Sequence, residues 1–129
     1  MNKILVEVSI GELLDKISIL EIKLDKIKDS ENLKFISNEH SILKTQLDNN
    51  VKSDDKLVKF FQSLKEINEK LWVIEDEKRQ CEKDKDFGEQ FIKLSRDVHF
   101  LNDERAKIKL DINNHTGSSI KEINEKLWV

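Results

Sequence analysis

SIGELLDKISILEIKLDKIK, residues 9–28, is the stretch of sequence that decides the fold. Its apolar residues recur in alternating steps of three and four, the spacing that places side chains along one stripe of an α-helix. This stripe consists of Ile10, Leu13, Ile17, Leu20, Leu24 and Ile27. Leu14, Ile19 and Ile22 lie outside the stripe, so the helix is apolar on more than one face. Such a helix packs against several neighbours, and we therefore expect it at the centre of the fold.

A capping box marks the start of this helix. Ser9 precedes Glu12 by three residues, so the Ser9 side chain can accept from the Glu12 amide while the Glu12 carboxylate reaches back to Ser9. The preceding KILVEV, residues 3–8, is rich in β-branched side chains and predicts a short extended arm over residues 1–8. A lone extended segment cannot satisfy its own backbone groups. We therefore expect it to pair with another segment, such as its copy in a second subunit.

The same rhythm of apolar residues continues along the chain and predicts one all-helical domain. The predicted helices cover residues 9–28, 31–48, 55–83 and 87–113, and residues 118–129 form a tail that suits a further short helix. Because the joins are short, neighbouring helices should be antiparallel, and the two longest should form a coiled-coil-like hairpin. The segment KEINEKLWV occurs twice, at 65–73 and again at 121–129.

Bulk composition excludes several classes of protein. The 129 residues are 38% charged, with no Pro and three Gly, which suits long solvated helices better than a sheet with many turns. A net charge of −3 gives no reason to expect a nucleic-acid partner. No apolar run is long enough to span a membrane, and the N-terminus does not resemble a signal peptide. The single Cys81 indicates a reducing, cytoplasmic setting.

Arg105 is the polar residue with the strongest claim to a special role, because it lies where the apolar stripe of its helix calls for an apolar side chain. A buried guanidinium needs partners, and Glu66, Glu69 and Glu21 are the expected ones. An ion pair with a purely structural role and a ligand site are both open at this point. The candidate polar cluster consists of Glu21, Glu75, Asp76, Arg79, Asn102, Arg105 and Lys109.

The histidines give only a weak metal signal. His99 with Asp103 and His115 with Asp111 are pairs four residues apart, which share a helix face but specify no third ligand. Such pairs are commonly salt links. The sequence therefore predicts no metal site and no cofactor.

Four blocks of sequence carry a family resemblance: VSIGELLDKISILEIK from residue 8, LWVIED at 71–76, DFGEQF at 86–91 and NDERAKIKLDIN at 102–113. As a set they resemble a small bacterial family of unknown function. The resemblance covers about residues 3–115 and leaves the duplicated tail outside. It implies a helical cytoplasmic protein with no assigned activity.

Two functional hypotheses follow from these patterns. The leading one is a non-catalytic helical interaction module that self-associates as a homodimer, because the first helix has two apolar faces and the arm lacks a partner. The alternative is a small all-helical enzyme or a ligand binder dependent on an anion or a metal. Its polar site would lie between the first, third and fourth helices, where Arg105 and Lys109 would grip an anion.

Overall fold

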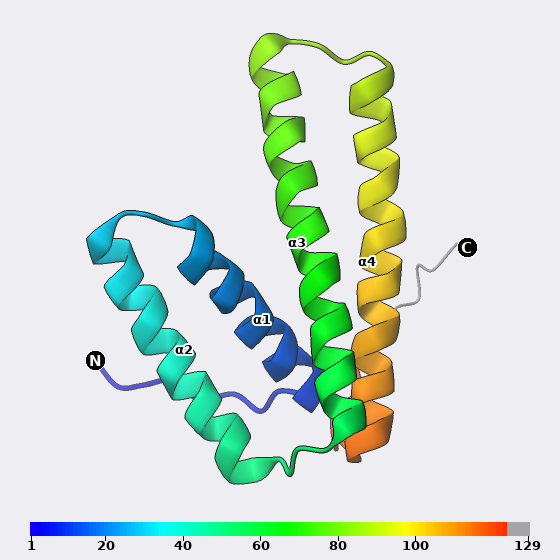
Figure 1. The fold of residues 1–129 in the computed structure, drawn as a ribbon. Helices are drawn as coiled ribbons and strands as arrows, with labels where there is room; N and C mark the ends of the chain where they lie inside the picture. The colour runs from blue at the N-terminus through cyan, green and yellow to red at the C-terminus, as the bar shows by residue number, and fades with distance from the viewer. Residues whose placement is uncertain (124–129) are drawn as a thin grey trace.

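The computed structural model describes residues 1–123 of the chain, which fold into a bundle of four helices (Figure 1). The helices are α1 (Ile10–Lys26), α2 (Ser30–Asn50), α3 (Asp55–Asp84) and α4 (Glu89–Thr116). This described part of the chain contains no β-strand, so the prediction of an all-helical bundle is confirmed. None of the helices found in residues 1–123 combines the length and the apolar character needed to cross a bilayer.

α1 lies at the centre of the bundle, as its two apolar faces predict. Among the described elements, α1 alone brings its backbone close to all three other helices, whereas the backbone of α2 comes close only to that of α1. Figure 1 shows α3 and α4 side by side, joined at their upper ends, with α1 reaching their lower half and α2 outside it. Eight of the 17 residues of α1 are buried, and none of α2 is. The two apolar faces of α1 are therefore covered by different neighbours.

The main hydrophobic core lies where α1 meets the lower halves of α3 and α4. Leu14 of α1, Leu57 and Leu64 of α3 and Ile112 of α4 form one buried cluster. Burying a side chain of this size contributes about 1.5–3 kcal/mol. Farther along the hairpin, beyond residue 72 of α3 and before residue 100 of α4, only Cys81 and Leu94 are buried. The upper half of the hairpin is therefore held together by a much thinner apolar seam.

Three helices begin at a capping side chain that the sequence supplies. Ser9 accepts from the Glu12 amide at 3.0 Å, and Asp29 and Asp54 cap α2 and α3 in the same way. The capping box at Ser9 is only half formed, because the Glu12 carboxylate binds Lys109 of α4 instead of the Ser9 amide. The second half of the predicted box is therefore wrong, and its carboxylate joins α1 to α4.

Backbone geometry sets the remaining helix boundaries. α4 starts at Glu89 because the Asp86 carboxylate accepts from the Gly88 amide at 3.1 Å and closes a turn before the helix. It ends at Thr116 because Gly117 has a φ of 68°, a left-handed conformation that glycine adopts without strain. Lys85, with a φ of 55°, ends α3 in the same conformation.

Both ends of the chain leave the bundle beside the first turn of α1. Residues 1–8 form neither helix nor strand and run behind α2, away from the α3/α4 pair (Figure 1). Their side chains are open to solvent: Ile4 and Leu5 are 90% exposed and Val6 is 76% exposed. The second half of the short helix predicted over 118–129, residues 124–129, lies outside the described residues. Residues 118–123 are described and form no helix.

Candidate functional site

An ion pair between Asp15 of α1 and Arg105 of α4 forms the centre of the polar interior. Arg105 Nε donates to Asp15 Oδ1 at 3.0 Å, and Arg105 Nη2 donates to Asp15 Oδ2 at 2.5 Å. The Asp15 side chain is 1% exposed and that of Arg105 is 30% exposed. The hydrogen bonds to Asp15 raise the pKa of Arg105 above its usual value, and burial opposes this shift. Both oxygens of a sealed carboxylate are therefore bound by one guanidinium.

Side chains from three helices complete this network. Asn68 of α3 donates through Nδ2 to Asp15 Oδ1 and to Ser18 Oγ, both at 2.8 Å. The Ser18 hydroxyl in turn donates to the Asp15 carbonyl at 2.7 Å. On the outer side, Arg105 Nη1 lies 3.5 Å from Asn102 Oδ1. Within residues 1–123, every buried side-chain nitrogen and oxygen has a hydrogen-bond partner. The network is fully satisfied, as a stable polar core requires.

The partner of Arg105 differs from the three glutamates that sequence reasoning named. Glu66 and Glu69 lie on another face of α3. They line a groove, and Arg105 is not one of the residues that line it. Glu21 binds Lys65 of α3 at 3.2 Å and His40 of α2 at 3.1 Å. The expected partners are therefore wrong. The reason is that α1 crosses the hairpin at Asp15, and the register of this crossing is not visible in the sequence.

The structure brings together five residues of the predicted polar cluster and separates two. Glu75, Asp76, Arg79 and Arg105 line one cleft of about 330 Å³ between α1, α3 and α4. Asn102 lies beside Arg105. Glu21 is engaged with α2 and α3 as described above. Lys109 binds Glu12 at 2.5 Å, at the crossing of α1 and α4.

This cleft has apolar walls and a charged rim. Ile19, Ile22, Leu71 and Trp72 line its walls, and Asn68 of the buried network is also part of its lining. Glu75, Asp76 and Arg79 are exposed, whereas the guanidinium of Arg105 is bound to Asp15. An apolar cleft with a few convergent polar groups is the usual form of a small-molecule site. Its free charges are two carboxylates and one guanidinium.

The first turn of α1 is held by polar side chains that sequence reasoning did not single out. Asn113 Oδ1 accepts from the Gly11 amide at 2.7 Å, and Ser118 Oγ accepts from the Ile10 amide at 3.2 Å. The Ser9 hydroxyl donates to Glu122, at the start of the duplicated tail. These contacts satisfy amides that a helix start leaves free. Asn113 belongs to one of the blocks that carry the family resemblance, residues 102–113, and this was the one feature of the sequence that could have drawn attention to it.

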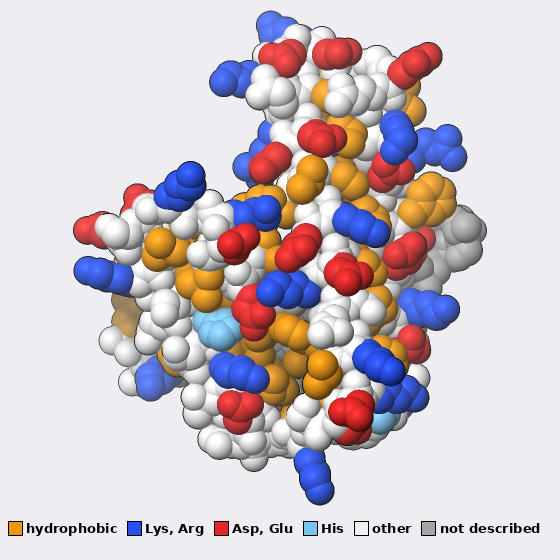
Figure 2. Space-filling view, in the orientation of Figure 1, with side chains coloured by type: hydrophobic (Ala, Val, Ile, Leu, Met, Phe, Trp, Pro, Cys, Tyr) orange, Lys and Arg blue, Asp and Glu red, His pale blue; other side chains and the backbone are white. Residues whose placement is uncertain are grey.

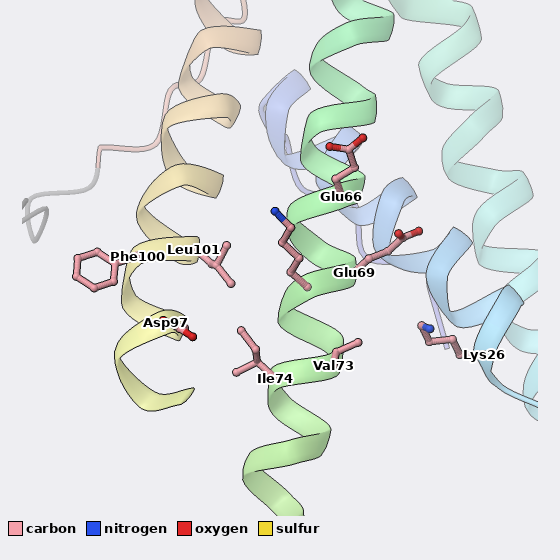
Figure 3. A pocket seen from close by; sticks show the side chains of 9 residues that line it. Lys26, Glu66, Glu69, Val73, Ile74, Asp97, Phe100 and Leu101 are labelled. Atoms are coloured by element: carbon pink, nitrogen blue, oxygen red, sulfur yellow. The ribbon is translucent and has the colours of Figure 1, made fainter. Parts of the chain in front are cut away.

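A larger groove of about 710 Å³ lies between α3, α4 and the end of α1 (Figure 3). Figure 3 shows Leu101 of α4 and Ile74 of α3 pointing toward each other across the space between the two helices. Glu69 and Val73 lie on the side of α3 that faces Lys26. The remaining residues that line the groove are Glu66, Lys70, Asp97 and Phe100.

Two of the three histidines, His40 and His115, have protein partners rather than a shared ligand position, whereas within residues 1–123 no hydrogen bond joins His99 to Asp103. His115 Nε2 is 2.8 Å from Asp54, the cap of α3, and not bound to Asp111. The pKa of Asp54 is lowered, first by the hydrogen bond from the Leu57 amide and then by that from His115. Among residues 1–123, no three His, Cys, Asp or Glu side chains lie close enough together to hold a metal ion.

The visible face of the molecule carries charges of both signs without a field of one sign. Figure 2 shows basic and acidic side chains interspersed over all four helices, with hydrophobic side chains gathered where α1, α2 and α3 meet. A nucleic-acid interface normally presents a continuous basic surface. This face has no such surface.

Comparison with known proteins identifies a family and no individual relative. Neither the curated proteins nor the solved structures provide a match to this chain. One family model matches residues 4–128. This match extends beyond residues 3–115, where the resemblance was expected to end, and takes in nearly all of the duplicated tail. The chain therefore belongs to DUF6165, a family of unknown function.

Proposed function

We propose that this chain is a non-catalytic helical interaction module that assembles with a second copy of itself. The observation that carries the proposal is the exposure of the N-terminal arm, residues 1–8. Three consecutive large apolar side chains of the arm, Ile4, Leu5 and Val6, are 76–90% exposed. No backbone hydrogen bond outside the helices joins residues 1–8 to the rest of the described chain. Apolar surface and free backbone groups together favour pairing with another polypeptide.

The arrangement of the helices supports the same proposal. Under this proposal, α3 and α4 form an antiparallel, coiled-coil-like hairpin, and the upper half of this hairpin projects from the bundle. Val73, Phe87, Ile92 and Phe100 are exposed apolar residues of this hairpin. A cytoplasmic setting belongs to the proposal, because Cys81 is a buried free thiol that has no disulfide partner within residues 1–123.

The Asp15–Arg105 pair fits a structural role in such a module. A catalytic or ligand-gripping arginine presents free N–H donors to its ligand, whereas Arg105 commits Nε and Nη2 to a sealed carboxylate. The pair joins α1 to α4, and Asn68 adds α3 to the same network. The role that we propose for the network is therefore to hold α1, α3 and α4 together.

A concentration series of the full chain tests self-association. Light scattering coupled to size exclusion should give twice the chain mass of 15.2 kDa at concentrations of about 10 μM and above. Deleting residues 2–6 should shift the protein to the mass of one chain, because it removes the apolar arm. Phe35→Ser, at an exposed apolar residue of α2, is the matched control and should leave the mass unchanged. A full chain that stays monomeric to about 100 μM would contradict the proposal.

The alternative of a ligand binder has one specific observation in its favour: the 330 Å³ cleft that holds Trp72, Glu75, Asp76 and Arg79. Titrating phosphate and acetate while recording tryptophan emission tests this alternative. Binding in the cleft should change the emission of the natural chain and leave that of Trp72→Phe unchanged. A saturable change that Arg79→Ala abolishes would favour ligand binding over a purely structural cleft.

A further inference from the structure

We propose that the 330 Å³ cleft between α1, α3 and α4 binds a free basic amino acid of the lysine type, with its α-amino group at Asn68 and its side-chain ammonium at Glu75 and Asp76. The inference goes beyond self-association and does not depend on it. The buried end of the cleft, its apolar middle and its acidic far end each match one part of such a ligand.

The buried end of the cleft presents a hydrogen-bond acceptor that no protein group satisfies. Asn68 is 6% exposed, and its Nδ2 donates to Asp15 and to Ser18. Within residues 1–123 no group donates to Asn68 Oδ1. Every sealed side-chain oxygen in that part of the chain has a partner, so Oδ1 is open to solvent, and Asn68 lines the cleft. Water can satisfy this oxygen in the free protein, and a ligand that displaces the water must bring a donor of its own.

Arg105 places a donor beside this acceptor. Asn68 Nδ2 and Arg105 Nε both donate to Asp15 Oδ1, at 2.8 and 3.0 Å, so the amide and the guanidinium are neighbours. The pair with Asp15 uses Nε and Nη2, whereas Nη1 has only a contact of 3.5 Å with Asn102. Nη1 is therefore left for a ligand while the pair that joins α1 to α4 stays intact. A donor next to an acceptor matches the carboxylate and the ammonium of an α-amino acid.

The middle of the cleft is apolar and suits an aliphatic stem. Leu71 and Trp72 follow Asn68 by about one helical turn, and Glu75 and Asp76 follow it by about two turns, which is roughly 11 Å along the axis. Side chains on a helix lean toward its N-terminus, which shortens this gap. The four methylenes of a lysine side chain, with a hydrogen bond of about 3 Å at each end, cover the distance that remains. They would pack on Leu71, Trp72 and the isoleucines of α1 that line the cleft.

The far end of the cleft carries a net negative charge. Glu75, Asp76 and Arg79 are exposed, and within residues 1–123 none of the three forms an ion pair. The charge of Arg105 is compensated by Asp15, so two carboxylates and one guanidinium of the cleft remain uncompensated. An anion would be repelled by the two carboxylates. A ligand with a net charge of +1, as lysine has at neutral pH, brings the sum to zero, and its ammonium donates charge-assisted hydrogen bonds to the carboxylates.

A series of three ligands tests both ends of the cleft. L-Lysine titrated into the full chain in a calorimeter should bind with a dissociation constant of about 1 mM or below. L-Norleucine has the same stem without the side-chain ammonium, and cadaverine is lysine without its carboxyl group. Each should bind at least about tenfold more weakly, because the first loses the two carboxylates and the second loses the Arg105 donor. If either analogue binds as tightly as L-lysine, or if L-lysine does not bind at about 10 mM, the proposal is overturned.

Charge variants on α3 test which carboxylates hold the side-chain ammonium. Glu75→Gln with Asp76→Asn should weaken L-lysine binding about tenfold or more, because it removes both acceptors at the far end. Arg79→Gln should strengthen binding about threefold, because it removes a cation beside them. Weaker binding in Arg79→Gln, which a site for anions would show, contradicts the assignment. Glu77→Gln with Glu82→Gln is the matched control, since it removes two exposed acids of α3 that do not line the cleft.

The control variant should bind L-lysine like the natural chain, and circular dichroism should show natural helix content in every variant. Equal weakening in the control and in the cleft variant would show that overall charge rather than the cleft attracts lysine, and would overturn the inference. Light scattering measures self-association separately, so the loss of this inference would leave the proposed function standing.

Discussion

At the scale of single residues, the Asp15–Arg105 pair shows how a charged residue can occupy an apolar stripe. Arg105 reaches across the helix interface and binds a carboxylate that is 1% exposed. Asn68 and Ser18 satisfy the remaining polar atoms around that carboxylate. Removing one member of a buried pair is costly because the other charge is then left without compensation. We therefore expect the pair to stabilise the fold.

Replacing Arg105 with Met should lower the unfolding free energy by about 3 kcal/mol, because Asp15 then keeps a buried charge without its cation. Urea denaturation followed by circular dichroism measures this change. Adding Asp15→Asn to Arg105→Met should recover a large part of the loss, since the uncompensated charge is removed. Arg79→Met, on the exposed rim of the neighbouring cleft, is the control and should change stability by less than about 0.5 kcal/mol. Natural stability in Arg105→Met would show that the pair contributes nothing to the fold.

At the scale of elements, the crossing of α1 and α4 depends on a close approach of two backbones. A Cβ atom added at Gly11 would lie 2.5 Å from the Lys109 carbonyl oxygen and 2.9 Å from Asn113 Oδ1. Asn113 Oδ1 is also the acceptor for the Gly11 amide. The glycine therefore allows α1 to start against α4, where Ser118 and Asn113 satisfy its free amides.

Gly11→Ala should destabilise the protein by about 2 kcal/mol, even though alanine favours a helix by about 1 kcal/mol relative to glycine. The added methyl must displace the α4 backbone rather than a flexible side chain. Thermal unfolding should show a lower midpoint. Gly88→Ala is the matched control, because its Cβ would meet only the Asp86 carboxylate, at 3.3 Å, and this can rotate away. Equal midpoints for Gly11→Ala and the natural chain would mean that α1 and α4 can move apart without a loss of stability.

At the scale of the whole molecule, stability is distributed unevenly along the hairpin. The lower halves of α3 and α4 pack against α1 and share the cluster of Leu14, Leu57, Leu64 and Ile112. In the upper halves, beyond residue 72 of α3 and before residue 100 of α4, only Cys81 and Leu94 are buried. Local opening has the lowest free energy where few apolar contacts must be broken.

Amide hydrogen exchange should therefore be faster in residues 75–99 than in residues 57–71 and 105–113. Mass spectrometry of peptides from the intact protein measures this gradient. Cys81→Ser should accelerate exchange further in the upper half and leave the lower half unchanged, because it places a polar group in the thin seam. Uniform exchange along both helices would contradict the gradient and would indicate that the upper half has cover beyond its own two helices.

Local signals in the sequence were sufficient for the all-helical class, for the cap at Ser9 and for the central position of α1. These features depend on residues three or four apart, whose relation is set by helix geometry alone. The candidate polar site was predicted in part for the same reason. Glu75, Asp76 and Arg79 lie close together on one helix, and they line a cleft with Arg105.

Only the tertiary structure decided which helix faces meet. Asp15 rather than Glu21, Glu66 or Glu69 binds Arg105, Lys109 binds Glu12, and Asn113 binds the Gly11 amide. Each of these contacts joins residues about 90 or more positions apart, so each depends on the angle and register at which α1 crosses α4. Apolar spacing specifies that a helix has a buried face. It does not specify the neighbour or the register, because side chains from distant parts of the chain must pack together before either is set.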